Sequence, residues 1–521
     1  MGGVITMKYD TERAVVTLSV TELCAMALLG GDLDLRPGKN KRFSPERAAI
    51  GTKIHRKLQS ASHVRYDAEL SMSNTTLYHG ICFEVSGRAD GLLWTDPLTV
   101  DEIKTVSASA YELPPAPMHD AQLRCYAHFL CRERGLDTVQ TRLTYYRMDD
   151  GEIKHLTAIH QAEELEFFYL KLLERIEYRA RILIERQTAL IPSAQQAHFP
   201  YASVREGQDI LIRECYRDIR AGKRLFAQAP TGTGKTLSTL YPAVRTLGEG
   251  HCDKIFYLTA KVSTRREAYR AAAQLFESGA HLRTIVLTSR EQICRNDAAK
   301  DDPAGISRHC NPLDCPYAKG FYDRCGAAVC DALSSGFGFP RSTVAALADR
   351  FHICPYELQL ELSEFCDIVI CDSNYAFDPQ VYLRRYFEAE AVDSNRYVFL
   401  IDEAHNLADR AMSMYSAELK SEQFAVLWQS LPESEERLRL SLEKLNVTLY
   451  GLRRLCRDTV FRDDAGVEHG YDVSRQPMES LYAIVREVRG VLDAWLRTHR
   501  GDVYEIEVHR AASALKNFEV I

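Results

Sequence analysis

The stretch Ala229–Thr236 reads Ala-Pro-Thr-Gly-Thr-Gly-Lys-Thr and follows a short apolar run, Leu225–Gln228. Glycines in such a turn allow backbone N–H groups to converge on phosphate oxygens at the start of a helix. The sequence therefore predicts a strand, a phosphate-binding loop and a helix in succession, which together form an ATP site. Lys235 is expected to neutralise the β- and γ-phosphates, and the Thr236 hydroxyl to bind Mg²⁺. The predicted nucleotide-binding residues are Gly232, Thr233, Gly234, Lys235 and Thr236.

A pair of carboxylates follows a second apolar run and is expected to complete the ATP site. Tyr397–Ile401 leads directly into the sequence Asp-Glu-Ala-His. We expect a buried strand here that places Asp402 beside the metal and Glu403 where it polarises the attacking water. Arg205 and Gln208, upstream of the loop, are weaker candidates for the same site, since a glutamine at this place can pair with the polar edge of adenine.

The order of the expected elements predicts an α/β fold class. Short apolar runs at residues 255–258, 284–287, 368–370 and 397–401 alternate with helical segments, a pattern typical of βαβ units and a parallel sheet. From about residue 407 the pattern is helical. A charged helical run, Ala162–Arg186, ends before Ile191–Ser193, which we interpret as a linker. We expect three domains: 1–190, 191–405 with an insertion at about 291–360, and 406–521.

Six of the fifteen cysteines lie between residues 294 and 354, which indicates a metal site. No apolar run is long enough to span a membrane and no signal peptide is present, so we expect a cytoplasmic protein in which disulfides are not favoured. Four thiolates can hold either Zn²⁺ or an iron–sulfur cluster. The ligand set Cys294, Cys310, Cys315 and Cys354 has the spacing C-x15-C-x4-C-x38-C, and Cys325 or Cys330 are alternatives to Cys315.

The N-terminal third contains a second group of acidic residues, Asp90 followed by Glu102 and Lys104. Alternation along a strand puts Glu102 and Lys104 on one face. The two carboxylates can share Mg²⁺ or Mn²⁺, while Lys104 positions water or stabilises the charge that develops on a phosphorus centre. A solvated hairpin is the alternative. A predicted helix before this group carries His55, and a later one, closed by Gly135, carries Gln122 and Tyr126 four residues apart.

The phosphate loop, the cysteine insertion and Asp-Glu-Ala-His, taken in this order, resemble the XPD/DinG-like iron–sulfur DNA helicases of superfamily 2. The resemblance covers about residues 200–410. It implies a RecA-like domain, a [4Fe–4S] cluster on Cys294, Cys310, Cys315 and Cys354 rather than zinc, and a helical arch that begins after residue 406. It also implies ATP hydrolysis coupled to 5′→3′ movement on a single DNA strand.

The order Gly-x-x-x-His, Asp, Glu-x-Lys, Gln-x-x-x-Tyr resembles the RecB-like nucleases of the PD-(D/E)XK superfamily, over about residues 18–135. The resemblance makes Asp90, Glu102 and Lys104 the catalytic trio and His55 an accessory metal or phosphate group. Gln122 and Tyr126 would then face DNA. Some of these nucleases hold a cluster on flanking cysteines, which we expect to be absent because no cysteine lies between Cys131 and Cys215.

These features together predict an ATP-dependent DNA helicase with an attached Mg²⁺-dependent nuclease, acting in DNA repair or end processing. The DNA partner is expected to be single-stranded or to have a single-stranded tail; the net charge of −7 requires any DNA-binding surface to be local. The alternatives are a metal-dependent nuclease with a regulatory ATP-binding clamp, and an ATP-dependent scaffold. The apolar end Phe518–Ile521 suggests a truncated frame, so the chain alone is expected to bind ATP and DNA but to unwind poorly.

Overall fold

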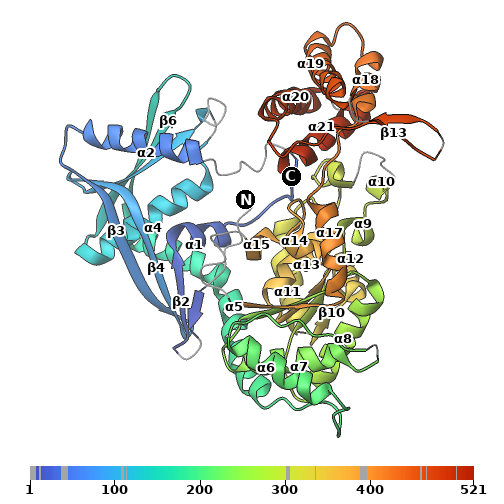
Figure 1. Ribbon diagram of the computed structural model, residues 1–521. Coiled ribbons are helices and arrows are strands. Elements are labelled where there is room, and N and C mark those ends of the chain that lie inside the picture. Colours follow the sequence, from blue (N-terminus) through green and yellow to red (C-terminus); the bar gives the residue numbers. More distant parts are fainter. Residues whose placement is uncertain are drawn as a thin grey trace.

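The computed structural model forms two α/β bodies and one helical body (Figure 1). In the part of the chain that is described, no helix is long and apolar enough to cross a membrane. The described residues are 8–10, 13–36, 45–106, 111–112, 114–230, 232–300, 306–334, 336–387, 396–457, 460–464, 466–499 and 501–521.

The first body is built on a seven-stranded mixed sheet with the order β1-β2-β4-β5-β6-β7, in which β3 also pairs with β4. Strands β3 and β4 form a long antiparallel hairpin, whereas β5 and β6 run parallel. Its strands are β1 (Lys8–Asp10), β2 (Val15–Ser19), β3 (Tyr66–Tyr78), β4 (Ile81–Leu93), β5 (Thr99–Val106), β6 (Thr138–Arg147) and β7 (Ile153–Gln161). Its helices are α1 (Val20–Ala27), α2 (Pro45–Ser60), α4 (Pro117–Arg134) and the first part of α5 (Ala162–Gln195).

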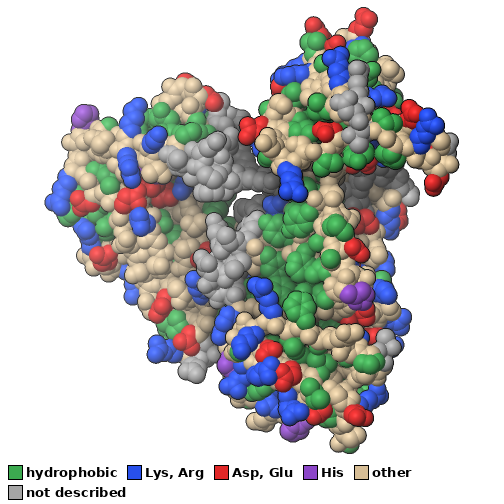
Figure 2. All heavy atoms as spheres, viewed as in Figure 1, with side chains coloured by type: hydrophobic (Ala, Val, Ile, Leu, Met, Phe, Trp, Pro, Cys, Tyr) green, Lys and Arg blue, Asp and Glu red, His purple; other side chains and the backbone are tan. Residues whose placement is uncertain are grey.

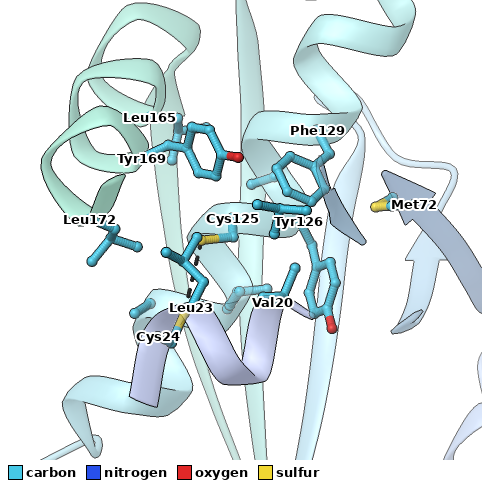
Figure 3. Packing of buried hydrophobic residues seen from close by; sticks show 14 of the residues in the cluster. Val20, Leu23, Cys24, Met72, Cys125, Tyr126, Phe129, Leu165, Tyr169 and Leu172 are labelled. Carbon is cyan, nitrogen blue, oxygen red and sulfur yellow. Dashed lines mark hydrogen bonds between the residues drawn. The ribbon is translucent and has the colours of Figure 1, made fainter. Parts of the chain in front are cut away.

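Helices α1, α4 and α5 bury their apolar faces in the core of the first body. Helix α1 begins at a capping box in which the Ser19 hydroxyl accepts from the Glu22 N–H (3.1 Å) and the Glu22 carboxylate accepts from the Ser19 N–H (2.7 Å). Helix α4 ends at Gly135, whose left-handed backbone closes the helix. Figure 3 shows the resulting packing of Val20, Leu23 and Cys24 of α1 with Cys125, Tyr126 and Phe129 of α4 and Leu165, Tyr169 and Leu172 of α5.

Helix α5 joins the first two bodies without a break. It has 34 residues, and its C-terminal part buries Leu190 and Ala194 in the core of the second body. The interpretation of Ile191–Ser193 as a linker is therefore wrong. Pro192 lies inside the helix, where it removes one backbone donor, but the burial of its neighbours outweighs this local cost.

The second body contains a five-stranded parallel sheet with the order β10-β9-β11-β8-β12. The carboxyl ends of its strands therefore meet at one edge, where parallel α/β sheets hold their ligands. The parallel sheet and the α/β class are thus confirmed. The strands are β8 (Lys254–Leu258), β9 (Thr284–Val286), β10 (Gly338–Phe339), β11 (Ile368–Cys371) and β12 (Tyr397–Ile401). The longer helices around them are α6 (Gln208–Arg220), α7 (Lys235–Gly248), α8 (Val262–Glu277), α12 (Arg341–Phe351) and α13 (Pro355–Glu364).

Two predictions about this sheet are wrong. Leu225–Gln228 forms no strand: the backbone is irregular, and the Phe226 side chain is 89% exposed. Strand β12 is not buried, because among the described strands it pairs with β8 alone, and Phe399 is 41% exposed. An apolar run gains from strand formation only where a neighbouring strand covers it, and the described residues supply no neighbour at this edge.

The cysteine-rich segment lies between β9 and β11, and short elements follow it. The segment contains α9 (Arg290–Ile293), α10 (Asp297–Lys300), η1 (Ile306–His309) and α11 (Phe321–Ser334). The elements between β11 and the helical body are α14 (Asn374–Phe377), α15 (Arg384–Phe387), η2 (Ala404–Asn406) and α17 (Leu407–Met414).

The tail is mostly helical, as predicted, and has its own core. Leu438, Leu442 and Leu445 of one helix pack against Val485 and Leu492 of another. The pattern did not predict the exposed hairpin that interrupts the helices. The elements are α18 (Ser421–Ser430), α19 (Glu436–Leu452), η3 (Arg453–Arg457), β13 (Val460–Arg462), β14 (Glu468–Gly470), α20 (Glu479–Thr498) and α21 (Glu505–Val520).

Candidate functional site

The phosphate-binding loop ends at the first residue of α7, so backbone N–H groups at this helix N-terminus are free of helical partners. Gly232 and Gly234 have φ angles of 81° and 76°, which L residues with a side chain rarely adopt. A Cβ atom on Gly234 would also lie 2.3 Å from Nε2 of Gln208. Glycine at 234 is therefore required both by the backbone and by the close approach of Gln208.

Arg205 and Gln208 hold the loop from outside. Nη1 of Arg205 donates to the carbonyl oxygen of Gly232 (2.7 Å), and Oε1 of Gln208 accepts from the backbone N–H of Arg205 (2.8 Å). The Gln208 side chain is buried against the loop. Both residues thus lie at the predicted site and fix the loop backbone, while a contact of Gln208 with adenine stays a prediction.

The loop and the acidic motif meet at the carboxyl edge of the second sheet. Asp402 directly follows β12, and its backbone N–H donates to the carbonyl oxygen of Leu258 in β8 (2.9 Å). Burial raises the pKa of the Asp402 carboxyl, and the charge of Glu403 adds to this, whereas the nearby Lys235 ammonium lowers it. Lys235 and Asp402 are therefore close enough to act on one ligand.

Tyr257 connects the two halves of this site, and no sequence motif indicated it. Its hydroxyl donates to Oγ1 of Thr236 at 3.4 Å, and burial together with the charge of Asp402 raises its pKa. The tyrosine comes from β8, the neighbour of β12, one residue before the strand ends. Such a residue is found only when the strand order is known.

Glu403 has a strained backbone, with φ 52° and ψ 42°, in the left-handed region. Such a conformation costs about 1–3 kcal/mol in a residue other than glycine and is concentrated at functional sites. The turn sends the chain away from β12 immediately after Asp402. As a result, both carboxylates stay at the edge of the sheet.

Lysine and arginine side chains gather near this site, over the part of the second body that carries α6 and α7 (Figure 2). Acidic side chains lie among them: Arg213 pairs with Asp209 at 3.1 Å, and Arg217 contacts Asp218 at 2.9 Å. The cluster is therefore partly neutralised rather than uniformly basic. Contact of this cluster with DNA stays a prediction.

The four cysteines of the preferred ligand set lie near one another. Burial raises the pKa of the Cys310 thiol to about 11, and the nearby thiols of Cys294 and Cys315 add to the effect. The pKa of Cys354 is raised to about 12 by burial, by Glu357 and by Cys310 among other groups. No three His, Cys, Asp or Glu side chains of the described residues stand in a preformed metal geometry.

The two alternative cysteines lie elsewhere. Cys325 and Cys330 are both close to Tyr178 on α5, and the charge that most raises the pKa of Cys325, after burial, is that of Glu361. The proximity of Cys294, Cys310, Cys315 and Cys354 thus favours this set over one containing Cys325 or Cys330. Four soft thiolate donors suit an iron–sulfur cluster as well as zinc.

The N-terminal acidic residues lie where β4 and β5 separate. The two strands pair only where Gly91–Leu93 of β4 meets Thr99–Asp101 of β5. The earlier part of β4 pairs with β2, and β5 pairs with β6 along its whole length. Asp90 bridges the opening: its Oδ2 accepts from the backbone N–H of Ile103 (2.7 Å), and its Oδ1 lies 3.1 Å from Nδ1 of His55. The hydrogen bond to Asp90 raises the pKa of His55.

Glu102 and Lys104 project from β5 into the same opening, as predicted from alternation. Nζ of Lys104 donates to Oε1 of Glu102 at 2.6 Å. Glu102 is 4% exposed, and its Oε2 has no hydrogen-bond partner among the described residues. Burial and the charge of Asp90 raise the pKa of Glu102 to about 7, although the Lys104 charge lowers it. A buried carboxylate oxygen without a partner is costly unless a cation or proton joins it.

Of the two predicted DNA-side residues on α4, Tyr126 lies near these carboxylates. Burial and the charges of Glu102 and Asp90 raise the pKa of the Tyr126 hydroxyl. Tyr126 packs on Gly87, where a Cβ atom would be 2.7 Å from the hydroxyl oxygen. Nε2 of Gln122 donates to Oγ1 of Thr21 at 3.1 Å, so Gln122 links α4 to α1.

Two residues beside this site escaped the sequence reasoning, although helical spacing could have found both. Gln59 lies one turn after His55 and donates to the carbonyl oxygen of Asp90 (3.0 Å). His119 lies three residues before Gln122; burial and the Lys104 charge lower its pKa to about 4, so its imidazole is neutral at pH 7.

Similar proteins were found for the second body. The family profile described as DEAD/DEAH box helicase matches residues 206–304, and the profile DEAD_2 matches residues 262–424. The "Regulator of telomere elongation helicase 1 homolog" of Caenorhabditis elegans is 29% identical over 238 residues, which cover 39% of this chain and 23% of the relative. The "General transcription and DNA repair factor IIH helicase subunit XPD" of Schizosaccharomyces pombe is 23% identical over 247 residues, which cover 42% and 31%.

This chain thus spans less than a third of the length of either relative. A solved structure titled "XPD_Helicase" is 18% identical, and the match covers 61% of this chain and 52% of that structure's chain. Its TM-score is 0.35, which is too low to say anything about function. The profile matches enclose the phosphate loop, the cysteine segment and Asp402. The chain is therefore similar to DEAD/DEAH box helicases over residues 206–304 and to the DEAD_2 family over residues 262–424.

Proposed function

We propose that this chain carries the ATP-hydrolysing half of a DNA helicase motor of the XPD-like iron–sulfur type. The observation that supports this most is the convergence of Lys235, Thr236 and Asp402 at one edge of a parallel sheet, with Tyr257 between them. The similarity to DEAD_2 helicases over residues 206–424 supports the same proposal. DNA as the substrate, and 5′→3′ movement along it, are parts of this proposal.

Each residue has a defined task in hydrolysis. Lys235 binds the β- and γ-phosphates, and Thr236 and Asp402 would hold Mg²⁺, which supplies positive charge to the transferring phosphoryl group. Glu403 orients the attacking water. In the structure Nζ of Lys235 donates to the carbonyl oxygen of Ala229 at 3.1 Å, so phosphate binding must exchange this contact for a stronger, charge-assisted one.

The test is DNA-stimulated ATP hydrolysis by the full chain. Lys235→Ala is expected to remove hydrolysis, because the charge on the phosphates is then unmatched. Lys223→Ala is the matched control, since Lys223 is an exposed lysine twelve residues before it. Full ATPase activity in Lys235→Ala would disprove the motor assignment. Stimulation of ATP hydrolysis by single-stranded DNA, measured in the same preparation, distinguishes a motor part from a regulatory ATP clamp.

We also propose a metal-dependent DNA nuclease site in the first body. The unpartnered Oε2 of Glu102, buried beside Asp90, supports it. Asp90 and Glu102 would hold Mg²⁺ or Mn²⁺, which activates water for attack on a phosphodiester. Lys104 then stabilises the charge on the phosphate, and His55 orients Asp90.

Nicking of DNA in the presence of Mn²⁺ tests the second site independently of the first. Lys104→Ala should abolish nicking and spare ATP hydrolysis, whereas Lys235→Ala should do the reverse. Lys154→Ala in strand β7 of the same sheet controls for a change of net charge. If the Lys104 variant cuts as fast as the wild type, the nuclease proposal fails and the motor proposal is untouched.

The third part of the proposal is a [4Fe–4S] cluster on Cys294, Cys310, Cys315 and Cys354. Their proximity and soft donors favour it, and such a cluster would supply structural cross-linking of the segment. Iron and acid-labile sulfide are measured in protein purified without oxygen. Cys315→Ser should lose both, and Cys330→Ser should keep them. Stoichiometric zinc without sulfide would refute the cluster.

A further inference from the structure

A short segment of the first body is built into the cysteine segment of the second. We call residues Gly30–Arg36 the docking strap. It leaves the end of α1, which appears in Figure 1 as the dark-blue helix beside α15, and contacts the chain between Cys310 and Asp323. The strap belongs to no helix or strand, so the pattern of the sequence does not reveal it.

Backbone hydrogen bonds attach the strap along its whole length. The N–H of Leu33 donates to the carbonyl oxygen of Ala318 (2.8 Å), that of Leu35 to Cys310 (2.9 Å), and that of Tyr322 to Gly31 (3.0 Å). A strap that merely passed over the surface would bond to water at these positions.

Two aspartates reinforce the attachment from opposite sides. Asp323 accepts from the N–H of Gly31 (2.7 Å), and Asp32 accepts from the N–H of Gly320 (2.6 Å). Leu33 is 2% exposed and lies in the core of the second body together with Cys315, one of the four clustered cysteines. Charged acceptors and a buried anchor together make this a specific contact.

The strap also lies between the two helices that complete the N-terminal acidic site. Before it, α1 supplies Thr21, the partner of Gln122. The next described element after it is α2, which supplies His55 and Gln59 to Asp90. The strap therefore lies, in the sequence, between the two helices that flank the carboxylates.

We propose that the docking strap makes the N-terminal metal site depend on the folded state of the cysteine segment. When Cys310 to Asp323 is ordered, the strap is held and α1 and α2 keep Gln122 and His55 in place. When the segment loses order, for instance by loss of its metal, the strap is released and the acidic site loses its flanking helices. The inference rests on the proposed nuclease function only where it concerns metal binding.

The test uses the full chain and two kinds of variant. Cys315→Ser perturbs the cysteine segment, and Asp323→Ala weakens the strap contact without touching a thiol. Asp209→Ala is the control, because this aspartate also lies in the second body but pairs with Arg213 on α6. The readouts are amide hydrogen exchange of residues 50–60 in α2 and Mn²⁺ affinity of the first body.

Asp323→Ala is expected to speed amide exchange at Leu33, Leu35 and α2 at least about tenfold. This factor corresponds to the loss of one charge-assisted hydrogen bond. Cys315→Ser should do the same and also weaken Mn²⁺ binding, while Asp209→Ala should not. In the double variant, Cys315→Ser should add little to Asp323→Ala, since the strap is already released. Unchanged α2 exchange in both single variants would overturn the inference. A wild-type chain that binds no Mn²⁺ would refute the nuclease proposal alone, because the exchange readout needs no metal.

Discussion

Glu102→Gln is the substitution whose outcome the structure defines most closely. Glutamine keeps the shape of the side chain but cannot ionise. In the wild type, burial raises the pKa of this carboxyl from 4.5 to about 7, although Lys104 lies beside it. The ionised form is therefore disfavoured in the folded protein relative to the unfolded chain.

The sign and size follow from proton linkage. Because the folded state binds this proton more tightly, its contribution to stability is complete below pH 4.5 and is lost as the pH rises to about 7. A shift of about 2.5 units corresponds to about 3 kcal/mol. At pH 8 the metal-free Glu102→Gln variant should thus have a Tm about 6–10 °C higher than that of the wild type, for a domain of this size. Near pH 4.5 the two proteins should be equally stable.

The assay is thermal unfolding in EDTA at several pH values, followed by the same series with Mn²⁺. Metal at a thousandfold excess over Kd should reverse the order at pH 8, because only the wild type offers a second carboxylate ligand and such an excess is worth about 4.1 kcal/mol. Glu69→Gln, which removes an exposed carboxylate on β3, is the control for the loss of one negative charge. A Glu102→Gln variant that is less stable at pH 8 without metal would refute the reasoning.

Three further predictions concern packing. Arg142→Ala removes the guanidinium that pairs with the Asp101 carboxylate at 2.9 Å, and Asp101 is only 1% exposed. The free energy of unfolding, measured in urea, should fall by about 3 kcal/mol, and a fall below 1 kcal/mol would contradict this. Gly248→Val should lower Tm by the equivalent of about 1–3 kcal/mol, since a Cβ atom there lies 2.8 Å from Cβ of Ala194 in α5; an unchanged Tm would show that the two helices can separate. Leu442→Ala should destabilise the helical body by about 2–5 kcal/mol while ATP binding, measured by calorimetry, stays normal.

The sequence was most informative where short-range chemistry decides the structure. The Gly-Lys-Thr sequence predicts the start of α7 at Lys235, and the apolar run before Asp402 predicts β12 with its observed bounds, Tyr397–Ile401. Alternation likewise puts Glu102 and Lys104 on one face of β5. In each case a few neighbouring residues determine the local conformation.

The failures all involve partners that are distant in the sequence. Leu225–Gln228 has the composition of a strand but no neighbouring strand in the described part of the chain, and Ile191–Ser193 looks like a break but is stabilised by burial of Leu190. Tyr257 enters the ATP site only because β8 adjoins β12. The docking strap has no pattern of its own, since its hydrogen bonds are made by backbone atoms of residues almost three hundred positions away.

Helix α5 has a mechanical consequence for how the proposed activities would cooperate. At 1.5 Å per residue, its 34 residues form a rod about 50 Å long that is embedded in two cores, so there is no joint at which one body could swing freely against the other. The N-terminal acidic site would then keep a constant distance from the proposed ATP site. The distance between the two proposed sites would then be set by the length of α5 rather than by a mobile linker.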